Sequence, residues 1–222
     1  MVDEWIHRYR PYDVICALEP TLTEERRARI ERVLAERLSG LTVVIENLHD
    51  PHNGAAALRS VEACGLCELH VVEASEPFRF SARVSQGCEK WVSIRRHADF
   101  ARCAKELHER GFALYAAVPG AERTLHELDV SRPAALVFGN EHAGLTQSAV
   151  EACDGTFGIP MHGFTQSLNL SVSVAISVFD CAKRRRLALG REGDLPAEHE
   201  LRLRARFCAL SLDERAAEGL VA

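Results

Sequence analysis

Polar residues that could do chemistry gather in three short segments of this chain, and each segment follows a run of β-forming residues. In chain order the segments read NLHDPHNGAAALRS from residue 47, VFGNEHAGLT from residue 137 and IPMHGFTQSLNLSVSVAI from residue 159. Their guanidinium, carboxylate, amide and hydroxyl groups suit a site that orients a substrate and stabilises charge developing on an oxygen. Ligands of parallel α/β sheets bind beyond the carboxyl ends of the strands, so we expect the three segments to converge on one site.

Several other chemistries are excluded by missing motifs. The chain has no GxGxxG, no GxxxxGK[ST] and no GxSxG, which argues against a dinucleotide-binding protein, a phosphate-loop NTPase and the commonest serine hydrolases. Cys64 and Cys67 form a CxxC pair without a second pair of ligands, and His49 and His52 share a turn without a third. We expect the eight cysteines to be reduced thiols that mostly fill the core, and no metal is predicted.

The elements that position these segments alternate between strands and helices. The β-rich runs predict strands at 41–46, 68–73, 90–95, 112–118, 134–139 and 155–160. Capping residues and terminal glycines predict helices at about 21–38, 54–65, 99–110, 146–153, 168–189 and 197–210. The first 20 residues show no clear period, although Thr21 and Glu24 form a capping-box pattern. This alternation predicts an α/β fold with a mainly parallel sheet.

Composition and charge narrow the class of protein further. The 222 residues are 47% hydrophobic and 27% charged, as expected of one globular domain with small appendages. The longest apolar runs fall short of the roughly 20 residues of a membrane span, and the first residues lack a signal-peptide pattern, so a cytoplasmic protein without membrane attachment is expected. The net charge is −5, but residues 41–182 carry −6 whereas 183–208 carry +4. Such a basic segment suits phosphate binding, and its alternative is a solvated helix face.

The three segments closely resemble the signature motifs of the SPOUT methyltransferases, in the SpoU/TrmH branch that methylates ribose 2′-hydroxyls. The flanking sequences TLTEERRARIERVLAERL and KWVSIRRH and the basic tail resemble those of TrmH-type tRNA (guanosine-2′-O)-methyltransferases. The resemblance implies a parallel sheet sandwiched by helices, a deep trefoil knot over about 134–182, S-adenosylmethionine as methyl donor, and a homodimer formed through the apolar helix of the third segment. It divides the chain into an RNA-binding helical extension (1–40), a methyltransferase core (41–182) and a basic helical tail (183–222).

The same resemblance assigns roles to particular residues. Matching the motifs residue by residue places Asn53, Arg59, Glu141, Ser167 and Asn169 in the active site. Cofactor contacts are implied for Ala117, Val118, Gly139, Ile159, Met161 and Leu168, and RNA contacts for Arg26, Arg29, Arg37, Arg184, Arg185 and Arg186.

Ordinary structural roles remain open for several of these residues. Arg59 could form a surface salt bridge, and Ser167 could cap the helix that follows it. Glu141 could act as a cap or pair with Arg59 or with a loop amide. Arg59 is expected to orient the ribose hydroxyl by donating hydrogen bonds, because a guanidinium stays protonated and makes a poor base.

The expected activity is therefore 2′-O-methylation of a ribose in tRNA, at a guanosine of the D-loop of the position-18 type. One alternative is a 2′-O-methyltransferase that acts on ribosomal RNA, because substrate choice depends on the shape of the flanks. The other is a knotted RNA-binding protein that no longer methylates. That alternative predicts loss of Arg59, Asn53, Ser167 or Asn169, yet all four are present.

Overall fold

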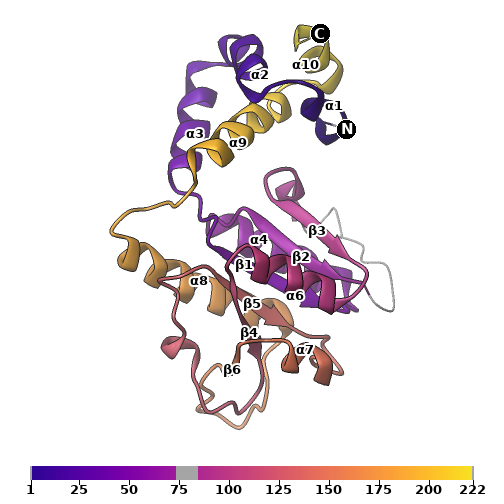
Figure 1. Cartoon of the computed structure of the whole chain (residues 1–222), viewed down its shortest axis with the longest axis vertical. Coiled ribbons are helices and arrows are strands. Elements are labelled where there is room, and N and C mark those ends of the chain that lie inside the picture. Colours follow the sequence, from indigo (N-terminus) through magenta and orange to yellow (C-terminus); the bar gives the residue numbers. More distant parts are fainter. Residues whose placement is uncertain (1, 74–84, 222) are drawn as a thin grey trace. The chain divides into compact units, whose positions relative to one another are not determined.

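The computed structural model describes residues 2–73 and 85–221, which form two compact units (Figure 1). Leu38–Arg191 makes up the larger unit and contains the whole sheet. The smaller unit combines the two ends of the chain, Met1–Arg37 and Glu192–Ala222.

The larger unit is built on one six-stranded parallel sheet. Its strands are β1 (Leu41–Glu46), β2 (Glu68–Val72), β3 (Ser93–His97), β4 (Ala113–Ala117), β5 (Ala134–Phe138) and β6 (Gly155–Phe157). They lie in the order β3-β2-β1-β5-β4-β6, and every neighbouring pair is parallel. β1, β2 and β5 are buried along their whole lengths, as expected for parallel strands covered on both faces. The predicted α/β class with a mainly parallel sheet is confirmed.

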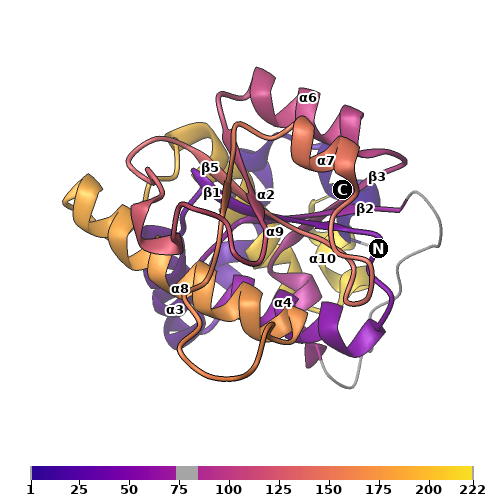
Figure 2. The same cartoon turned by 90° about the horizontal axis from the view of Figure 1, so that it is seen from below.

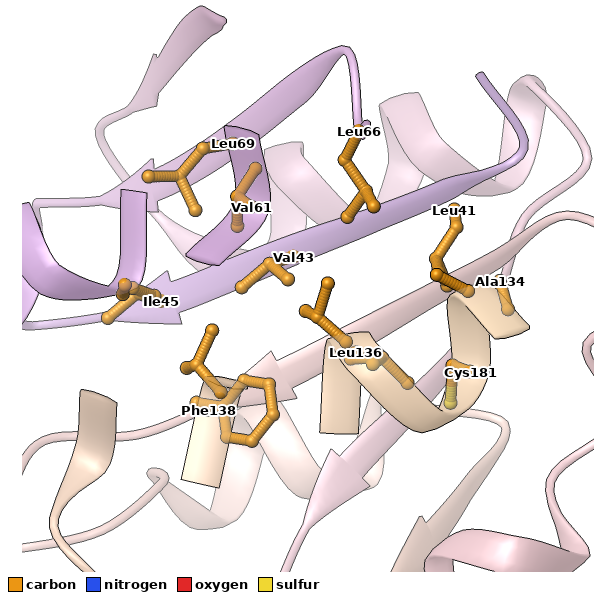
Figure 3. Close-up of a cluster of buried hydrophobic side chains, with 14 of the residues drawn as sticks. Leu41, Val43, Ile45, Val61, Leu66, Leu69, Ala134, Leu136, Phe138 and Cys181 are labelled. Carbon is orange, nitrogen blue, oxygen red and sulfur yellow. The ribbon is translucent and has the colours of Figure 1, made fainter. Parts of the chain in front are cut away.

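Helices cover both faces of this sheet, as Figure 2 shows. On one face lie α4 (Pro51–Ala63) and α8 (Leu170–Leu189), and on the other lie α6 (Phe100–Glu109) and α7 (Gln147–Glu151). Alternate residues of β1 and β5 supply the two apolar layers. The layer beneath α4 and α8 contains Val43, Ile45, Leu136 and Phe138 (Figure 3). This two-sided burial holds the carboxyl ends of the strands in fixed register.

Two helices begin at residues that sequence patterns placed differently. α4 begins at Pro51, with Asp50 as its N-cap, so Asn53 lies in the first helical turn and not at the end of a loop. Pro at the first helical position is favoured because its missing N–H has no partner there anyway. α8 begins at Leu170, and its N-cap is Asn169, which accepts a hydrogen bond from the Ser171 backbone N–H; the capping role considered for Ser167 is wrong.

The other helix and strand boundaries differ from the predicted ones by a few residues. The predicted strand 90–95 is displaced to β3 because Cys88–Lys90 forms a short 3-10 turn, η3, with Trp91 at its end. Asp99 caps α6 as predicted, and Thr146, the predicted first residue of the next helix, is the N-cap of α7. A further 3-10 turn, η4 (Leu125–Glu127), precedes β5.

The smaller unit is helical. It contains α1 (Val2–Trp5), α2 (Pro11–Leu18), α3 (Glu24–Ala35), α9 (Ala197–Leu210) and α10 (Glu214–Val221), with the 3-10 turns η1 (Ile6–Arg8) and η2 (Glu19–Thr21). α3 is capped by Thr23, not by the predicted Thr21, because the Thr23 hydroxyl accepts the Arg26 N–H. A side chain at Gly193 would overlap the backbone of Ala35, so glycine is required where the two ends of the chain meet. No helix among residues 2–73 and 85–221 has the length and apolar character needed to cross a bilayer.

Candidate active site

The candidate site lies at the point where the strand order of the sheet reverses, between β1 and β5. From β1 the chain adds β2 and β3 on one side, whereas β5, β4 and β6 lie on the other. β1 and β5 are neighbours, and the loops that leave their carboxyl ends carry the first two polar segments. Such a switch point is the usual ligand-binding position in open α/β sheets.

Glu141 joins the loop after β5 to the loop after β1. Its two carboxylate oxygens accept hydrogen bonds from the backbone N–H groups of His49 (3.2 Å) and Asp50 (3.3 Å). One of these oxygens also accepts a hydrogen bond from the Asn53 Nδ2 at 2.9 Å. The backbone donors lie just before or at the N-cap of α4, where a negative charge is stabilised by the helix dipole.

Asn53 extends this network to the third segment. Its Oδ1 accepts a hydrogen bond from the Asn169 Nδ2 at 3.0 Å. The Oδ1 of Asn169 in turn accepts hydrogen bonds from the backbone N–H and the hydroxyl of Ser171. The predicted convergence of the three segments therefore takes the form of a chain of side chains, Glu141–Asn53–Asn169, which we call the bridging chain.

The ionisation of Glu141 suits a carboxylate that keeps its hydrogen-bond donors in place. Burial raises the pKa of a carboxyl, but here the hydrogen bonds from Asn53 and from the backbone of Glu141, His49 and Asp50 outweigh it. The pKa of Glu141 consequently lies below its usual range. A carboxylate that is kept ionised in this way can fix its donors firmly and is a weak proton acceptor.

Residues that sequence reasoning missed shape the loop after β5. The Asn140 Nδ2 donates to the Asn47 carbonyl at 2.6 Å, and the Asn140 and Gly144 backbones bond to each other in both directions. Glu46, 3% exposed at the end of β1, accepts hydrogen bonds from the backbone N–H and the hydroxyl of Thr146. In the sequence, Glu46 could have been noticed as the one charged residue of the strand LTVVIE, at its carboxyl end.

Gly139 meets a strict steric requirement in this loop. A Cβ at this position would overlap the backbone of Gly144 and Leu145. The loop's own backbone therefore requires glycine at this position, and the predicted contact of Gly139 with a cofactor stays a prediction.

The third loop, residues 159–168, carries three of the predicted cofactor contacts. Within the described part of the chain, no hydrogen bond is made by any residue of this loop. Ile159 and Leu168 are half-buried, whereas Met161 is 36% exposed. Backbone donors and acceptors of this loop are thus available to a ligand.

Ala117 and Val118 lie beside the start of this loop. The Val118 N–H donates to the Phe157 carbonyl, and the Ala121 N–H donates back to Val118 across a turn. Gly120 has a φ of +74° in that turn, which matches a type II turn with Pro119 at its second position. The Pro-Gly pair thus ends β4 and keeps Val118 against β6.

Arg59 and Ser167 lie at the surface, and neither takes part in the hydrogen bonds of the bridging chain. Arg59 lies on α4 beyond Asn53, with its side chain exposed, and its charge acts on the nearby Cys88. Ser167 is exposed two residues before the N-cap of α8. Both side chains are open to a substrate.

The predicted RNA-contacting arginines fall into two groups. On α3, Arg29 is exposed and Arg26 is half-buried. Arg37, by contrast, is 1% exposed, with its guanidinium over the Phe207 ring.

The three arginines of α8 are engaged by the larger unit. Arg184 binds Asp180 and the carbonyls of Leu125 and Leu128. Arg185 is 5% exposed and donates to the Val130 and Arg132 carbonyls, and Arg186 donates to the Cys64 carbonyl. Their positive charges are therefore less available to phosphates than the sequence indicates.

Comparison of the chain with known protein families agrees with this geometry. The model of the SpoU rRNA Methylase family matches residues 40–179, which include the sheet, the bridging chain and the first half of α8. The chain belongs to this SpoU methylase family.

Its relatives in this family include several named tRNA methyltransferases. A tRNA (guanosine(18)-2′-O)-methyltransferase of Thermus thermophilus is 43% identical over 169 residues, which cover 76% of this chain and 87% of the relative. The enzyme of the same name from Escherichia coli is 33% identical over 182 residues, covering 80% of each chain. Among solved structures, the A. aeolicus TrmH/SpoU tRNA modifying enzyme is similar with a TM-score of 0.75 at 29% identity, covering 86% of this chain and 98% of that one.

Proposed function

We propose that this protein methylates the ribose 2′-oxygen of guanosine 18 in tRNA, with S-adenosylmethionine as donor. The observation that carries the proposal is the bridging chain, which joins Glu141, Asn53 and Asn169 from three separate segments. The relatives named tRNA (guanosine(18)-2′-O)-methyltransferase support the choice of nucleotide. A protein that only bound RNA would not need this arrangement of polar side chains together with an exposed Arg59 on the same helix as Asn53.

The residues present fit S-adenosylmethionine. Loop 159–168 offers backbone groups without partners in the described part of the chain, and half-buried Ile159 and Leu168 offer an apolar wall. Val118 and the loop around Gly139 would complete the pocket. When bound, this cofactor supplies a methyl group that its sulfonium sulfur already activates for displacement.

The protein's task is then to align the ribose oxygen and to manage its charge. Arg59 donates hydrogen bonds to the ribose hydroxyl and stabilises negative charge as the oxygen attacks, because its guanidinium stays protonated. Asn53 and Asn169 hold the loops at a fixed separation, and Ser167 contacts substrate or cofactor. Glu141 anchors Asn53 as a carboxylate. Alignment of this kind supplies a large share of the barrier reduction in a displacement reaction.

A homodimer formed through α8 is part of the proposal. Val174, Val178 and Cys181 pack against the sheet, whereas Val172, Ile176 and Phe179 stay 42%, 40% and 68% exposed. The three exposed residues follow helical spacing and form one apolar stripe on the opposite face. Because a helix that is apolar on both faces must be covered, a second copy of the chain is the proposed occupant. Replacing Phe179 by Asp should give monomers in sedimentation velocity, whereas the exposed Tyr12→Asp control should leave the dimer intact.

RNA binding is assigned first to α3. Exposed Arg29 and half-buried Arg26 are the predicted contacts that the fold leaves most available. The division into an RNA-binding extension (1–40), a core (41–182) and a basic tail (183–222) remains a prediction, as do the trefoil knot over about 134–182 and the cytoplasmic location.

The test is methyl transfer in vitro to an unmodified tRNA transcript, with the modified nucleoside identified by mass spectrometry. We expect 2′-O-methylguanosine, and no product from the same tRNA carrying adenosine at position 18. Fragments of ribosomal RNA form the second arm. Methylation of those fragments with none of the tRNA would replace this proposal by the ribosomal alternative, and no transfer to either RNA would favour a binding protein.

A further inference from the structure

A second group of side chains with metal-binding chemistry lies outside the candidate active site. His70 is in the middle of β2, His97 ends β3 and Cys103 lies on α6. Their ligand atoms all lie within 4.8 Å of one another. The side chain of His70 is 0% exposed, that of His97 is 8% exposed, and Cys103 is fully buried.

We propose that His70, His97 and Cys103 bind a divalent transition metal, with Zn²⁺ as the best match. Imidazole nitrogen and thiolate sulfur are the ligands that zinc prefers, and three protein ligands leave a fourth position for water. The His70 Nδ1 and the His97 Nε2 are 2.9 Å apart, and the Cys103 Sγ is 4.0 Å from the His70 Nδ1. Tetrahedral bonds of about 2.0–2.3 Å separate such ligand atoms by about 3.3–3.7 Å, so these two pairs need shifts of roughly half an ångström and the third pair, within 4.8 Å, about 1 Å at most.

The outward-facing nitrogens of both histidines point to carboxylates. The His70 Nε2 lies 3.4 Å from a Glu68 oxygen, and the His97 Nδ1 lies 3.9 Å from a Glu106 oxygen. Metal-binding histidines commonly direct their second nitrogen to a carboxylate, which fixes the tautomer and strengthens the ligand. Arg110 also pairs with Glu68 at 2.7 Å and holds that carboxylate in place.

The second nitrogen of His70 is compatible with this assignment. The His70 Nε2 is fully enclosed, and its distance of 3.4 Å from the Glu68 carboxylate is longer than that of an ordinary hydrogen bond. A metal on Nδ1 would keep the proton on Nε2 and direct it to Glu68. Burial raises the pKa of the Cys103 thiol to about 12, so the bound metal must displace the thiol proton to solvent as the metal–sulfur bond forms.

The location indicates a metal that ties elements of the fold together. The three ligands connect β2, β3 and α6, on the face of the sheet opposite to α4 and α8. A bound ion would link the edge strand β3 to its neighbour and to the helix that covers it.

The experiment titrates the metal-free full-length protein with Co²⁺, followed by Zn²⁺ as competitor. We expect a thiolate-to-cobalt charge-transfer band and intense visible bands of a tetrahedral site, saturating at one ion per chain and lost when Zn²⁺ is added. Cys103→Ser should abolish the charge-transfer band and weaken Zn²⁺ binding by more than the roughly 10- to 100-fold typical of losing an outer-shell partner. Cys208→Ser removes another fully buried thiol, in the smaller unit, and should leave the titration unchanged.

Two results would overturn the proposal. One is a wild-type cobalt spectrum without the thiolate band, which surface histidines alone would produce. The other is a Cys103→Ser protein that keeps the wild-type band and affinity. If Cys103→Ser does not fold, His97→Gln at the edge of the cluster should still lower the affinity, and the wild-type spectrum decides the question by itself.

Discussion

At the scale of single residues, Glu141 shows how a charged group serves the site without taking part in proton transfer. Its pKa is depressed by hydrogen bonds, so its folded-state contribution to stability is present above the unfolded pKa and is lost as pH falls through the folded pKa. Glu141→Gln removes the charge but keeps the shape. We expect the free energy of unfolding of the variant to fall less than that of wild type between about pH 6 and pH 3, measured by urea denaturation. Parallel curves would contradict this role for the carboxylate.

Arg59 is the residue on which the proposed chemistry depends most directly. Its side chain is exposed, so Arg59→Ala should leave the thermal unfolding temperature unchanged. Methyl transfer should fall by about 10²- to 10⁴-fold, because the developing charge on oxygen loses its donor. Arg59→Lys should restore only part of the rate, since one ammonium cannot present the planar set of donors. Near-normal turnover of a folded Arg59→Ala protein would remove Arg59 from the mechanism.

At the scale of elements, the loop after β5 depends on the absence of a side chain. Gly139→Ala would force the Cβ into the backbone of Gly144 and Leu145, so the loop must move. Because Glu141 sits in this loop, its bonds to the start of α4 would be lost as well. We expect weaker cofactor binding by calorimetry and lower activity. Gly219→Ala, in α10 of the smaller unit, where a Cβ also meets nothing within 4 Å, is the matched control and should bind the cofactor nearly as wild type does.

The end of α8 offers a second test at this scale. Arg185 is buried and donates to two carbonyls, so Arg185→Ala should destabilise the protein by about 1–3 kcal/mol, the cost of leaving buried groups unpaired. Urea denaturation would measure the loss. If Arg185 instead served mainly to bind RNA, stability would stay unchanged and the affinity for tRNA would fall.

At the scale of the whole molecule, a protein with a net negative charge must bind tRNA, which is also negatively charged. The chain carries a net charge of −5, so its affinity for tRNA must come from local basic surfaces. Replacing Arg26 and Arg29 by Ala should flatten the dependence of affinity on salt by up to about two units of slope, a little under one unit for each phosphate contact. Arg102 and Arg132, exposed arginines of the larger unit, provide the matched double-Ala control. Equal slopes for both variants would show α3 to be a solvated face, and cofactor affinity should stay constant throughout.

Sequence alone determined the elements with strong local signals. The buried strands β1, β2 and β5 appear in the sequence as apolar runs because both faces of a parallel sheet are covered. Asp99 and Thr146 are residue types that favour the N-cap position, and α6 and α7 begin directly after them. α2 escaped detection because a helix of eight residues shows barely two turns of periodicity. The motif residues were found by their resemblance to a known family, which records spacing along the chain.

Tertiary structure decided which side chains meet. Glu141 and Asn53 are 88 positions apart, and Asn53 and Asn169 are 116 apart, so no local pattern could predict their hydrogen bonds. The same holds for His70 and Cys103, which come from a strand and a helix outside any metal-binding motif. It also decided which charges stay exposed: in a run of three arginines on one helix, Arg185 is buried because its side chain faces carbonyl groups of a distant loop. The position of a residue along a helix or strand determines the face on which its side chain lies. Only the packing between elements determines which groups that side chain contacts.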